Sequence, residues 1–560
     1  MMTGGEALAR QLQHEGVSRI FTVPGVQLDW AFDGLHRIGR SIATTVPRHE
    51  QATSYMADGY ARSTGQPGVC MMVPGPGLLN AMAGLSTAYS CSSPVLCISG
   101  QIHSKGVGRN YGMLHEIPEQ SAALRSVTKW QGFAHTAQEI PGLVRQAFHE
   151  MTSGQPRPVA IEVPYDVLAA QADCALVDPS AAAHAAPDAA RIEAAAALLS
   201  KARMPVIYAG GGVLAGKASA ALQALAERLQ APVVMSDNGR GAISDRHPLA
   251  LTTLGGRAVL PHADVVLVVG SRFMETMAPT PVWTAAQTRF IHLNANADDL
   301  GAPRQVDVAI QADARLGLLA LEAAVTSATT VSAGARAQDM DRVRAWCDEQ
   351  INALGLLSQW VRALRAAIPE DGILVNELTQ AGYLSRVAYP VYAPGTFLSQ
   401  GYQGTLGSGF AVALGAAVAN PGRAVVSITG DGGFGWNLQE LATMRKYDIN
   451  AVVVVFNDGQ FGNVRAIQKA EFGYAYDVDL HNPHFRQLAE AFGVPSATVE
   501  KPAELQAELA RALARGGPTL IEVKVSEMNS PWPLLKLRNA MKQVAPVGPN
   551  PLGEPATQRA

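Results

Sequence analysis

Two apolar runs separated by a helical segment constrain what the C-terminal third of this 560-residue chain can fold into. Residues 425–429 read Val-Val-Ser-Ile-Thr, and residues 451–456 read Ala-Val-Val-Val-Val-Phe. Runs of this kind are typical of strands that are buried on both faces of a parallel sheet. Residues 437–446, between them, carry apolar side chains at helical spacing. The order strand, helix, strand predicts two adjacent parallel strands.

Each predicted strand ends in a turn that carries a carboxylate. Gly430-Asp431-Gly432-Gly433 follows the first strand, and Asn457-Asp458-Gly459-Gln460 follows the second. The carboxyl ends of parallel strands meet at one edge of a sheet, where open α/β folds bind ligands. A Gly-Asp-Gly tripeptide alone would indicate only a tight turn.

The two turns together predict a divalent cation that holds a phosphate. Mg²⁺ prefers oxygen ligands and takes only a few of them from protein. The expected metal ligands are Asp431, Asp458 and the backbone carbonyl of Gln460. Backbone N–H groups of Gly432 and Gly433 are expected to face the phosphate, because glycine lets the backbone approach a ligand closely.

The longer pattern resembles the cofactor-binding motif of the thiamine-diphosphate-dependent enzymes. Gly430-Asp431-Gly432 is followed by Asn437, Glu440-Leu441, Thr443 and Asn457-Asp458. The family motif begins Gly-Asp-Gly and ends Asn-Asn, and the offset from Asp431 to Asp458, 458 − 431 = 27, matches its spacing. Asp458 stands where the family usually has its second Asn. It keeps an oxygen ligand and adds a negative charge to the site.

A second motif, near the N-terminus, resembles the pyrimidine-binding domain of the same enzymes. It comprises Arg48-His49-Glu50-Gln51, residues 56–62, Gly68-Val69 and Pro74-Gly75-Pro76-Gly77. The resemblance implies that Glu50 bonds a ring nitrogen of the cofactor's aminopyrimidine and thereby activates the cofactor. Without the resemblance, Glu50 is an acidic residue in the first turn of a helix, which the helix dipole favours.

Two further segments resemble cofactor-binding loops of the family. They are residues 401–409, with Leu406 beneath the cofactor and the Gly404 carbonyl at its amino group, and residues 376–379. The full set of expected cofactor contacts is Thr379, Gly404, Leu406, Gly430, Gly432, Gly433, Asp458 and Phe461.

The fold class predicted for the whole chain is α/β, with three doubly wound parallel-sheet domains. The expected divisions are a pyrimidine-binding domain at 1–171, a central domain at 189–325, a diphosphate-binding domain at 340–527 and a tail at 528–560. Apart from the two strands at 425–429 and 451–456, the predicted strands are 20–23, 42–46, 68–73, 95–99, 159–163, 206–209, 233–236, 265–270 and 290–293. Residues 172–188 and 326–338 are expected to be connectors. The Pro-rich tail, with Lys536, Arg538 and Lys542, predicts either a poorly ordered end or a lid.

Composition excludes several classes of protein. A net charge of −3 does not indicate the excess of basic residues that binds nucleic acid or an anionic membrane. No apolar run reaches the roughly 18 residues of a membrane span, and no signal peptide is evident. Five cysteines, an odd number without metal-ligand spacing, favour reduced thiols. We therefore expect a soluble cytoplasmic protein. The resemblance implies a homodimer or a dimer of dimers, in which Glu50 meets Asp431 of the partner subunit.

The reaction is less constrained than the cofactor. Gln27, which follows Pro24-Gly25-Val26, and His115, in Leu114-His115-Glu116, are the candidate catalytic residues beside Glu50. A lone His is often structural, and both interpretations of His115 stay open. Val73 stands where benzoylformate decarboxylases have a histidine. The chain most resembles the acetolactate synthase group, although Leu114-His115-Glu116 departs from the Phe-Gln-Glu of that group.

The resemblance implies a carboligase that makes or breaks a C–C bond next to a carbonyl, with a 2-oxo acid, an aldehyde or an acyl-CoA as substrate. A 2-oxo acid decarboxylase, a 2-hydroxyacyl-CoA lyase and a non-catalytic paralogue are the alternatives. Expected cofactors are thiamine diphosphate and Mg²⁺. FAD is a further candidate, because central domains of this type bind it in some relatives.

Overall fold

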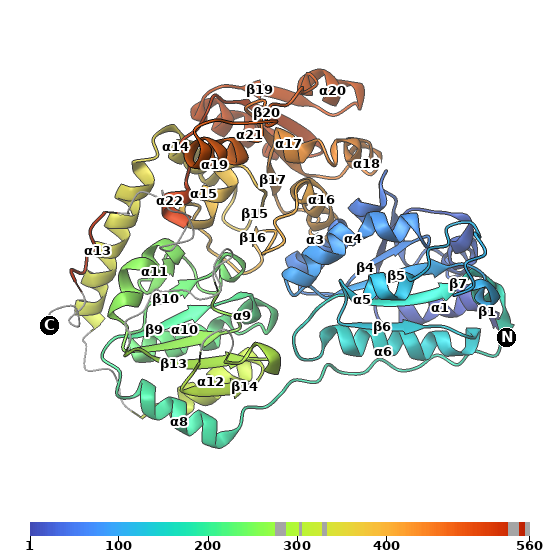
Figure 1. The fold of residues 1–560 in the computed structure, drawn as a ribbon, viewed down its shortest axis with the longest axis horizontal. Coiled ribbons are helices and arrows are strands. Elements are labelled where there is room, and N and C mark those ends of the chain that lie inside the picture. The colour runs from blue at the N-terminus through green and yellow to red at the C-terminus, as the bar shows by residue number, and fades with distance from the viewer. Residues whose placement is uncertain (275–286, 302–304, 327–332, 536–547, 555–560) are drawn as a thin grey trace.

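Three six-stranded parallel sheets build the protein and confirm the predicted fold class (Figure 1). The computed structural model describes residues 1–274, 287–301, 305–326, 333–535 and 548–554. Lys536, Arg538 and Lys542 of the tail lie outside the described residues. Within the described residues, no helix is both long and apolar enough to cross a membrane.

The N-terminal sheet has the order β3-β2-β4-β5-β7-β6. Its strands are β2 (Arg19–Thr22), β3 (Ala43–Thr45), β4 (Gly68–Met72), β5 (Val95–Gln101), β6 (Trp130–Phe133) and β7 (Val159–Pro164). The helices of this part are α1 (Gly4–His14), α2 (Asp29–Arg37), α3 (Glu50–Thr64), α4 (Pro76–Ser90), α5 (Gln120–Arg125), α6 (Ile140–Thr152) and α7 (Tyr165–Ala169).

Successive residues of β4 show that both faces of this sheet are covered. Cys70 and Met72 join one hydrophobic cluster with side chains of α3 and α4. Val69 and Met71 point to the other face and join a cluster with α1, α2 and α6. The alternation follows from the two-residue period of a strand. Burial on both faces explains why the strand reads as a continuous apolar run.

The central sheet has the order β11-β10-β9-β12-β13-β14. Its strands are β9 (Pro205–Ala209), β10 (Val233–Met235), β11 (Ala250–Thr252), β12 (Val265–Val269), β13 (Arg289–Asn294) and β14 (Val308–Gln311). Its helices are α8 (Ala189–Leu199), α9 (Gly211–Ala215), α10 (Ser219–Leu229), α11 (Thr253–Val259) and α12 (Ala314–Ala324). Residues 173–188, which connect to it, form no helix or strand, whereas α13 (Ala333–Asn352) begins inside the expected connector 326–338.

The C-terminal sheet has the order β16-β15-β17-β18-β20-β19 and contains the two strands predicted first. Its strands are β15 (Ile373–Asn376), β16 (Phe397–Leu398), β17 (Val425–Gly430), β18 (Val452–Asn457), β19 (Ser496–Val499) and β20 (Thr519–Lys524). The helices are α14 (Leu356–Ala367), α15 (Gln380–Ala388), α16 (Ser408–Ala419), α17 (Asp431–Phe434), α18 (Leu441–Lys446), α19 (Gly462–Phe472), α20 (Phe485–Ala491), α21 (Pro502–Arg515) and α22 (Trp532–Leu535). An antiparallel pair, β1 (Met2–Thr3) with β8 (Gln171–Ala172), completes the strands described.

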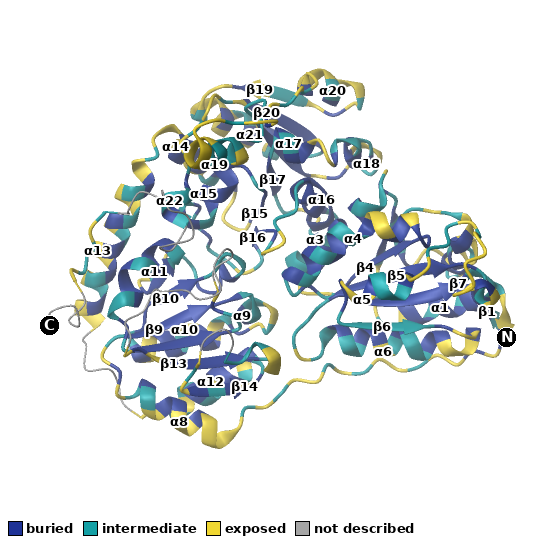
Figure 2. Ribbon diagram, viewed as in Figure 1, coloured by how far each residue is buried: buried dark blue, intermediate teal, exposed yellow. Residues whose placement is uncertain are grey.

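The C-terminal domain packs against both of the others. One hydrophobic cluster joins it to the central domain, and another joins it to the N-terminal domain. In the second cluster α3 and α16 lie side by side at the centre of the molecule (Figures 1 and 2). A Cβ atom on Gly59 would lie 2.0 Å from the carbonyl oxygen of Val412, and one on Gly415 would lie 2.0 Å from that of Met56. The two helices can therefore approach this closely only because both positions are glycine.

We predict that Gly415→Ala destabilises the contact between the two domains. The added methyl group must push α3 away from α16, so we expect the melting temperature to fall by several degrees, corresponding to about 1–3 kcal/mol. Gly142→Ala in α6 is the matched control, because a Cβ atom there meets nothing within 4 Å. That control is expected to be neutral or slightly stabilising. Equal thermal shifts for both variants would contradict the prediction.

Candidate active site

Asp431 and Asp458 lie at the carboxyl ends of two paired strands, as the sequence predicted. β17 and β18 are parallel, with Gly430 opposite Phe456, so the residues that follow each strand meet at one edge. Gly430-Asp431-Gly432-Gly433 was expected to be a turn, and it instead opens the short helix α17. Asp431 is 3% exposed, and its Oδ2 atom accepts hydrogen bonds from the N–H of Gly459 (2.9 Å) and Nδ2 of Asn482 (2.5 Å).

The electrostatics of this pair are those of an anionic site. Burial and the neighbouring charge of Asp431 raise the pKa of Asp458 to about 6. Burial also raises the pKa of Asp431, although hydrogen bonds from Asn482 and from backbone N–H groups oppose the shift. Neither carboxylate forms an ion pair with a lysine, arginine or histidine in the described part of the chain. Two close, partly desolvated carboxylates are unfavourable unless a cation compensates them.

A cation here would need ligands from outside the protein. The described residues contain no group of three or more His, Cys, Asp or Glu side chains that could hold a metal. Mg²⁺ commonly binds to one or two carboxylates and completes its shell with phosphate and water. The Gln460 carbonyl, the third expected ligand, already accepts a hydrogen bond from the N–H of Gly462 at 2.9 Å, which leaves it one lone pair. The donor set therefore fits a metal–diphosphate group.

The predicted cofactor contacts from four segments come together around this edge. The ring of Phe461 lies against Gly432, where a Cβ atom would be only 2.8 Å from Cε1 of that ring. A Cβ atom on Gly430 would lie 3.5 Å from Cβ of Thr379, at the N-terminus of α15. Gly404 has φ +57°, a conformation that favours glycine, and its Cβ position faces Leu378. Leu406, half-buried, lies just before α16.

Glu377 is a buried carboxyl group that the sequence analysis did not select. Its Oε2 atom accepts hydrogen bonds from the Gly409 N–H (3.0 Å) and Thr429 Oγ1 (2.8 Å), and its Oε1 atom accepts one from the Gly407 N–H. A Cβ atom on Gly433 would lie 2.3 Å from Oε1. Burial raises the pKa of Glu377 to about 7. The carboxyl group therefore ties the Leu406 loop to the end of β17.

A signal for Glu377 was present in the sequence. It is an ionisable residue directly after the apolar strand β15, at the same sheet edge as Asp431. Only Thr379 was selected from that segment.

Glu50, the candidate activating residue, begins α3. It is half-buried, and its Oε2 atom accepts a hydrogen bond from Nδ2 of Asn80 at 3.0 Å. Gly77 lies against it, because a Cβ atom there would be 3.7 Å from Oε1 of Glu50 and 2.7 Å from Cγ2 of Val73. The glycine-rich loop after β4 thus packs beside Glu50.

Gln27 and His115 are in direct contact, although 88 positions separate them. Nδ1 of His115 lies 3.0 Å from Oε1 of Gln27, and Nε2 of Gln27 donates to the Leu114 carbonyl at 3.1 Å. Gln27 is 5% exposed, and His115 has φ +66°, which few non-glycine residues adopt. The carbonyl of His115 packs against Gly75. The pair therefore lies beside the same loop as Glu50, with strained backbone of the kind found at functional sites.

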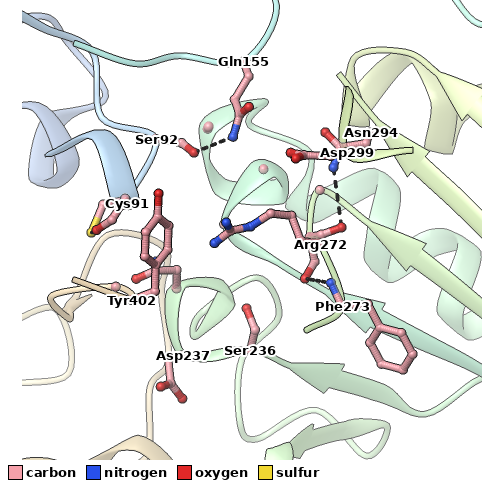
Figure 3. Close-up of a pocket in the computed structure, with 18 of the residues that line it drawn as sticks. Cys91, Ser92, Gln155, Ser236, Asp237, Arg272, Phe273, Asn294, Asp299 and Tyr402 are labelled. Atoms are coloured by element: carbon pink, nitrogen blue, oxygen red, sulfur yellow. Dashed lines mark hydrogen bonds between the residues drawn. The ribbon is translucent and has the colours of Figure 1, made fainter. Parts of the chain in front are cut away.

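A cavity of about 530 Å³ lies among the three domains (Figure 3), and its lining reaches Leu378 and Gly404 of the candidate cofactor site. Its walls include Gly211 and Gly212 of the glycine-rich turn after β9, together with Asp237 and Asp299. The guanidinium group of Arg272 lies 4.4 Å from the ring centroid of Tyr402, which comes from the segment that also holds Gly404. A cation–π contact of this kind closes one side of the cavity.

We predict that Glu377 makes the stability of the protein depend on pH. Between pH 4.5 and about 7, the folded protein keeps a proton on Glu377 that the unfolded chain has released. The folded state therefore loses stability as the pH rises through this window, by at most about 3 kcal/mol. Glu377→Gln removes this titration. The melting temperature of the wild type minus that of Glu377→Gln should thus fall between about pH 5 and about pH 8. An unchanged difference would mean that Glu377 titrates normally.

Comparisons with known proteins identify the family. Three family models match this chain: the thiamine pyrophosphate enzyme N-terminal TPP binding domain at residues 2–123, the central domain at 192–321 and the C-terminal TPP binding domain at 379–523.

Full-length relatives agree with these matches. The chain is 34% identical over 534 residues to a "Probable 2-ketoarginine decarboxylase" of Pseudomonas aeruginosa, covering 93% of this chain and 94% of that protein. It is 32% identical over 564 residues to a "Probable acetolactate synthase large subunit" of Methanocaldococcus jannaschii, covering 94% and 92%. It is 30% identical over 551 residues to the acetolactate synthase isozyme 1 large subunit of Escherichia coli, covering 95% and 96%. The chain belongs to the thiamine-pyrophosphate-dependent enzymes.

Proposed function

We propose that this enzyme binds thiamine diphosphate through Mg²⁺ and joins a 2-oxo acid to a second carbonyl compound, with loss of carbon dioxide. One observation carries the metal part of the proposal: Asp431 and Asp458 are close, partly buried carboxylates without a cationic partner among the described residues. A dication would relieve their repulsion, and the N–H groups at the start of α17 would face the diphosphate.

The proposed roles follow from where each residue lies. When bound, thiamine diphosphate supplies a carbon nucleophile that adds to a carbonyl group. Asp431, Asp458 and the Gln460 carbonyl would hold the metal, and Thr379 and Gly430 would border the diphosphate. Leu406 would support the bent cofactor, and Glu377 keeps the Leu406 loop in place. Glu50 would exchange a proton with the aminopyrimidine ring, which a half-buried carboxyl group can do.

The active enzyme is proposed to be a homodimer or a dimer of dimers. The region around Gln27 and His115 and the C-terminal region around Asp431 both carry exposed apolar side chains. Single subunits rarely expose large apolar patches. Near Gln27 and His115 the exposed set comprises Val26, Leu79, Tyr111 and Leu114. In the C-terminal domain the exposed set includes Trp436, which follows α17, and Val464 and Phe472 of α19, which begins directly after Phe461. Association of these two faces would bury both sets and bring Glu50 to Asp431 of the partner.

Gln27 and His115 are proposed to handle protons on the substrate. Their hydrogen bond fixes the imidazole orientation, and a positioned imidazole is the commonest general acid or base. Among the relatives, names of both kinds occur, acetolactate synthase and 2-ketoarginine decarboxylase. Val73, at the place where some decarboxylases have a histidine, favours carboligation over simple decarboxylation. Decarboxylase or 2-hydroxyacyl-CoA lyase activity remains the second candidate.

The central cavity supports a second proposed ligand. Its volume of about 530 Å³, its glycine-rich turn and the Arg272 guanidinium group suit a nucleotide-containing cofactor such as FAD. All five cysteines are free, which suits the reducing cytoplasm as the compartment.

We expect the purified protein, supplied with thiamine diphosphate and Mg²⁺, to convert pyruvate or a longer 2-oxo acid into a condensation product. His115→Ala should lower kcat by about 100-fold, as the loss of a general acid or base does. Its affinity for thiamine diphosphate, measured by fluorescence titration, should not change, because His115 is not among the proposed cofactor contacts. Aldehyde as the main product would move the assignment to a decarboxylase.

Mixing two inactive chains tests the shared site. Glu50→Gln and Asp431→Ala should each abolish turnover on their own. A hybrid dimer of the two chains contains one site in which both Glu50 and Asp431 are intact, so mixing after reversible dissociation should restore about a quarter of wild-type activity. Remixing either variant with itself is the control. Mixed chains that form hybrids and stay inactive would show that each site lies within one subunit.

A further inference from the structure

A segment of the C-terminal domain holds the backbone on both sides of Glu50 in the same chain. The carboxylate of Glu440, 0% exposed, accepts hydrogen bonds from the N–H of Arg48 (3.0 and 3.1 Å) and the N–H of His49 (3.1 Å). Thr443 Oγ1 donates to the same carboxylate at 2.5 Å. One buried carboxylate therefore fixes the two residues that precede Glu50.

The residue after Glu50 is held by the same segment. Nε2 of Gln51 donates to the Trp436 carbonyl at 2.7 Å and to Oδ1 of Asn437 at 3.1 Å. Among the described residues, the side chain of Glu50 accepts one hydrogen bond, from Nδ2 of Asn80. The direction in which Glu50 points is thus set mainly by the backbone at 48–51, and residues 436–440 hold that backbone.

The same segment also reaches the loop that supports the cofactor. Nδ2 of Asn437 donates to the Gly407 carbonyl at 2.5 Å, directly after Leu406. A Cβ atom on Gly407 would lie 2.5 Å from Cβ of Trp436, so the two backbones are in close contact. Residues 436–440 therefore connect Glu50 and Leu406 of one chain.

From these contacts we propose that Glu440 is a positioning residue for Glu50 of its own chain. The inference rests on the proposed function, in which Glu50 serves the site that the partner's Asp431 completes. Glu440 lies inside the metal-binding motif of one site and acts on the other site. Its carboxylate is needed because four donors converge on it, the fourth being Nε2 of Gln439 at 3.5 Å, and an amide in its place would turn an N–H group toward a backbone N–H.

The first test measures cofactor activation directly, as the rate at which the thiazolium C2 proton of bound thiamine diphosphate exchanges with deuterium. We expect Glu440→Gln to slow this exchange by about tenfold or more, since small misplacements of a reacting group are costly. Cofactor affinity should stay within about threefold of the wild type, because the residues that hold the diphosphate are untouched.

A double-variant cycle separates positioning from general damage. Glu50→Gln sets the lowest exchange rate, and adding Glu440→Gln should lower it no further if Glu440 acts only through Glu50. Additive losses in the double variant would overturn the proposal. The matched control is Asp264→Asn in the central domain, since Asp264 also accepts from two successive N–H groups, those of Arg203 (2.7 Å) and Met204 (3.0 Å). This control should lower stability without slowing exchange.

Hybrid dimers show on which site Glu440 acts. In a hybrid of a Glu440→Gln chain with a Glu50→Gln chain, the only site with an intact Glu50 uses Glu50 of the Glu440→Gln chain. We expect that site to be as slow as in the Glu440→Gln homodimer. Full single-site activity would mean that Glu440 serves its own metal motif and would overturn the proposal.

Two further measurements keep the outcome unambiguous. If Glu440→Gln does not fold, Gln51→Ala can replace it, because this change removes the contact on the other side of Glu50. Gln51→Ala should slow the exchange of the C2 proton in the same way, but more mildly. An unchanged exchange rate in Gln51→Ala would count against the proposal. Restored activity in the Glu50→Gln and Asp431→Ala mixture, described above, establishes the shared site independently. Its absence would refute the shared site, whereas restored activity together with fast exchange in Glu440→Gln would refute this inference alone.

Discussion

The close crossing of α3 and α16 is the contact on which the candidate site depends. α3 begins with Glu50, and α16 begins two residues after Leu406. This pair of helices therefore positions one candidate residue of the N-terminal domain and one of the C-terminal domain. Gly59 and Gly415 allow the two backbones to touch at the crossing. Helices that pack through backbone contact have little freedom to slide, because any displacement opens a void or creates a clash. The relative orientation of the N-terminal and C-terminal domains is therefore fixed within a single chain.

Buried carboxyl groups in this protein are compensated in two different ways. Glu377 and Glu440 each receive three hydrogen-bond donors from backbone and threonine groups, which suits a structural role. Asp431 receives donors mainly at Oδ2, and the pKa of Asp458 is raised by burial and by the charge of Asp431. Desolvated carboxylates that lack enough donors are costly unless a cation joins them. The difference in donors marks the pair that is suited to a metal.

The sequence predicted strands in all three sheets, but it missed both edge and interior strands: the edge strand β3 was predicted, whereas the interior strands β15 and β20 of the C-terminal sheet were not. Strands such as β17 and β18 are buried on both faces, so their apolar runs could be recognised without the structure. β6, Trp-Gln-Gly-Phe, is a half-buried edge strand with a glycine, and β14 alternates at another edge. Neither forms a continuous apolar run. Residues 431–434 form a helical turn, and Gly430 directly before it has extended backbone. The glycines of this segment are compatible with a tight turn as well, so the sequence alone did not predict the helix.

Some residues of the candidate site could be predicted from the sequence, and others could not. Asp431, Asp458 and Gly432 could be predicted because strand ends and turn residues determine where they lie. The hydrogen bond between Gln27 and His115 could not be predicted from spacing, since it joins the loop after β2 to a loop 88 positions later. Glu377 was missed although it directly follows an apolar strand, because its hydrogen-bond donors, among them the N–H groups of Gly407 and Gly409, lie about 30 positions away and cannot be identified from spacing.

The stretch from Asp431 to Asp458 therefore contains residues that face two directions. Its two ends carry the carboxylates at the sheet edge, whereas Asn437 and Glu440 in its middle hold the backbone around Glu50. A helical segment placed between parallel strands must cross one face of the sheet, so its side chains are available to whatever packs on that face. Here the N-terminal domain of the same chain packs there. The segment that connects the two proposed metal ligands consequently also contacts the backbone around the residue proposed to activate a second cofactor, and a change in domain orientation would alter both regions.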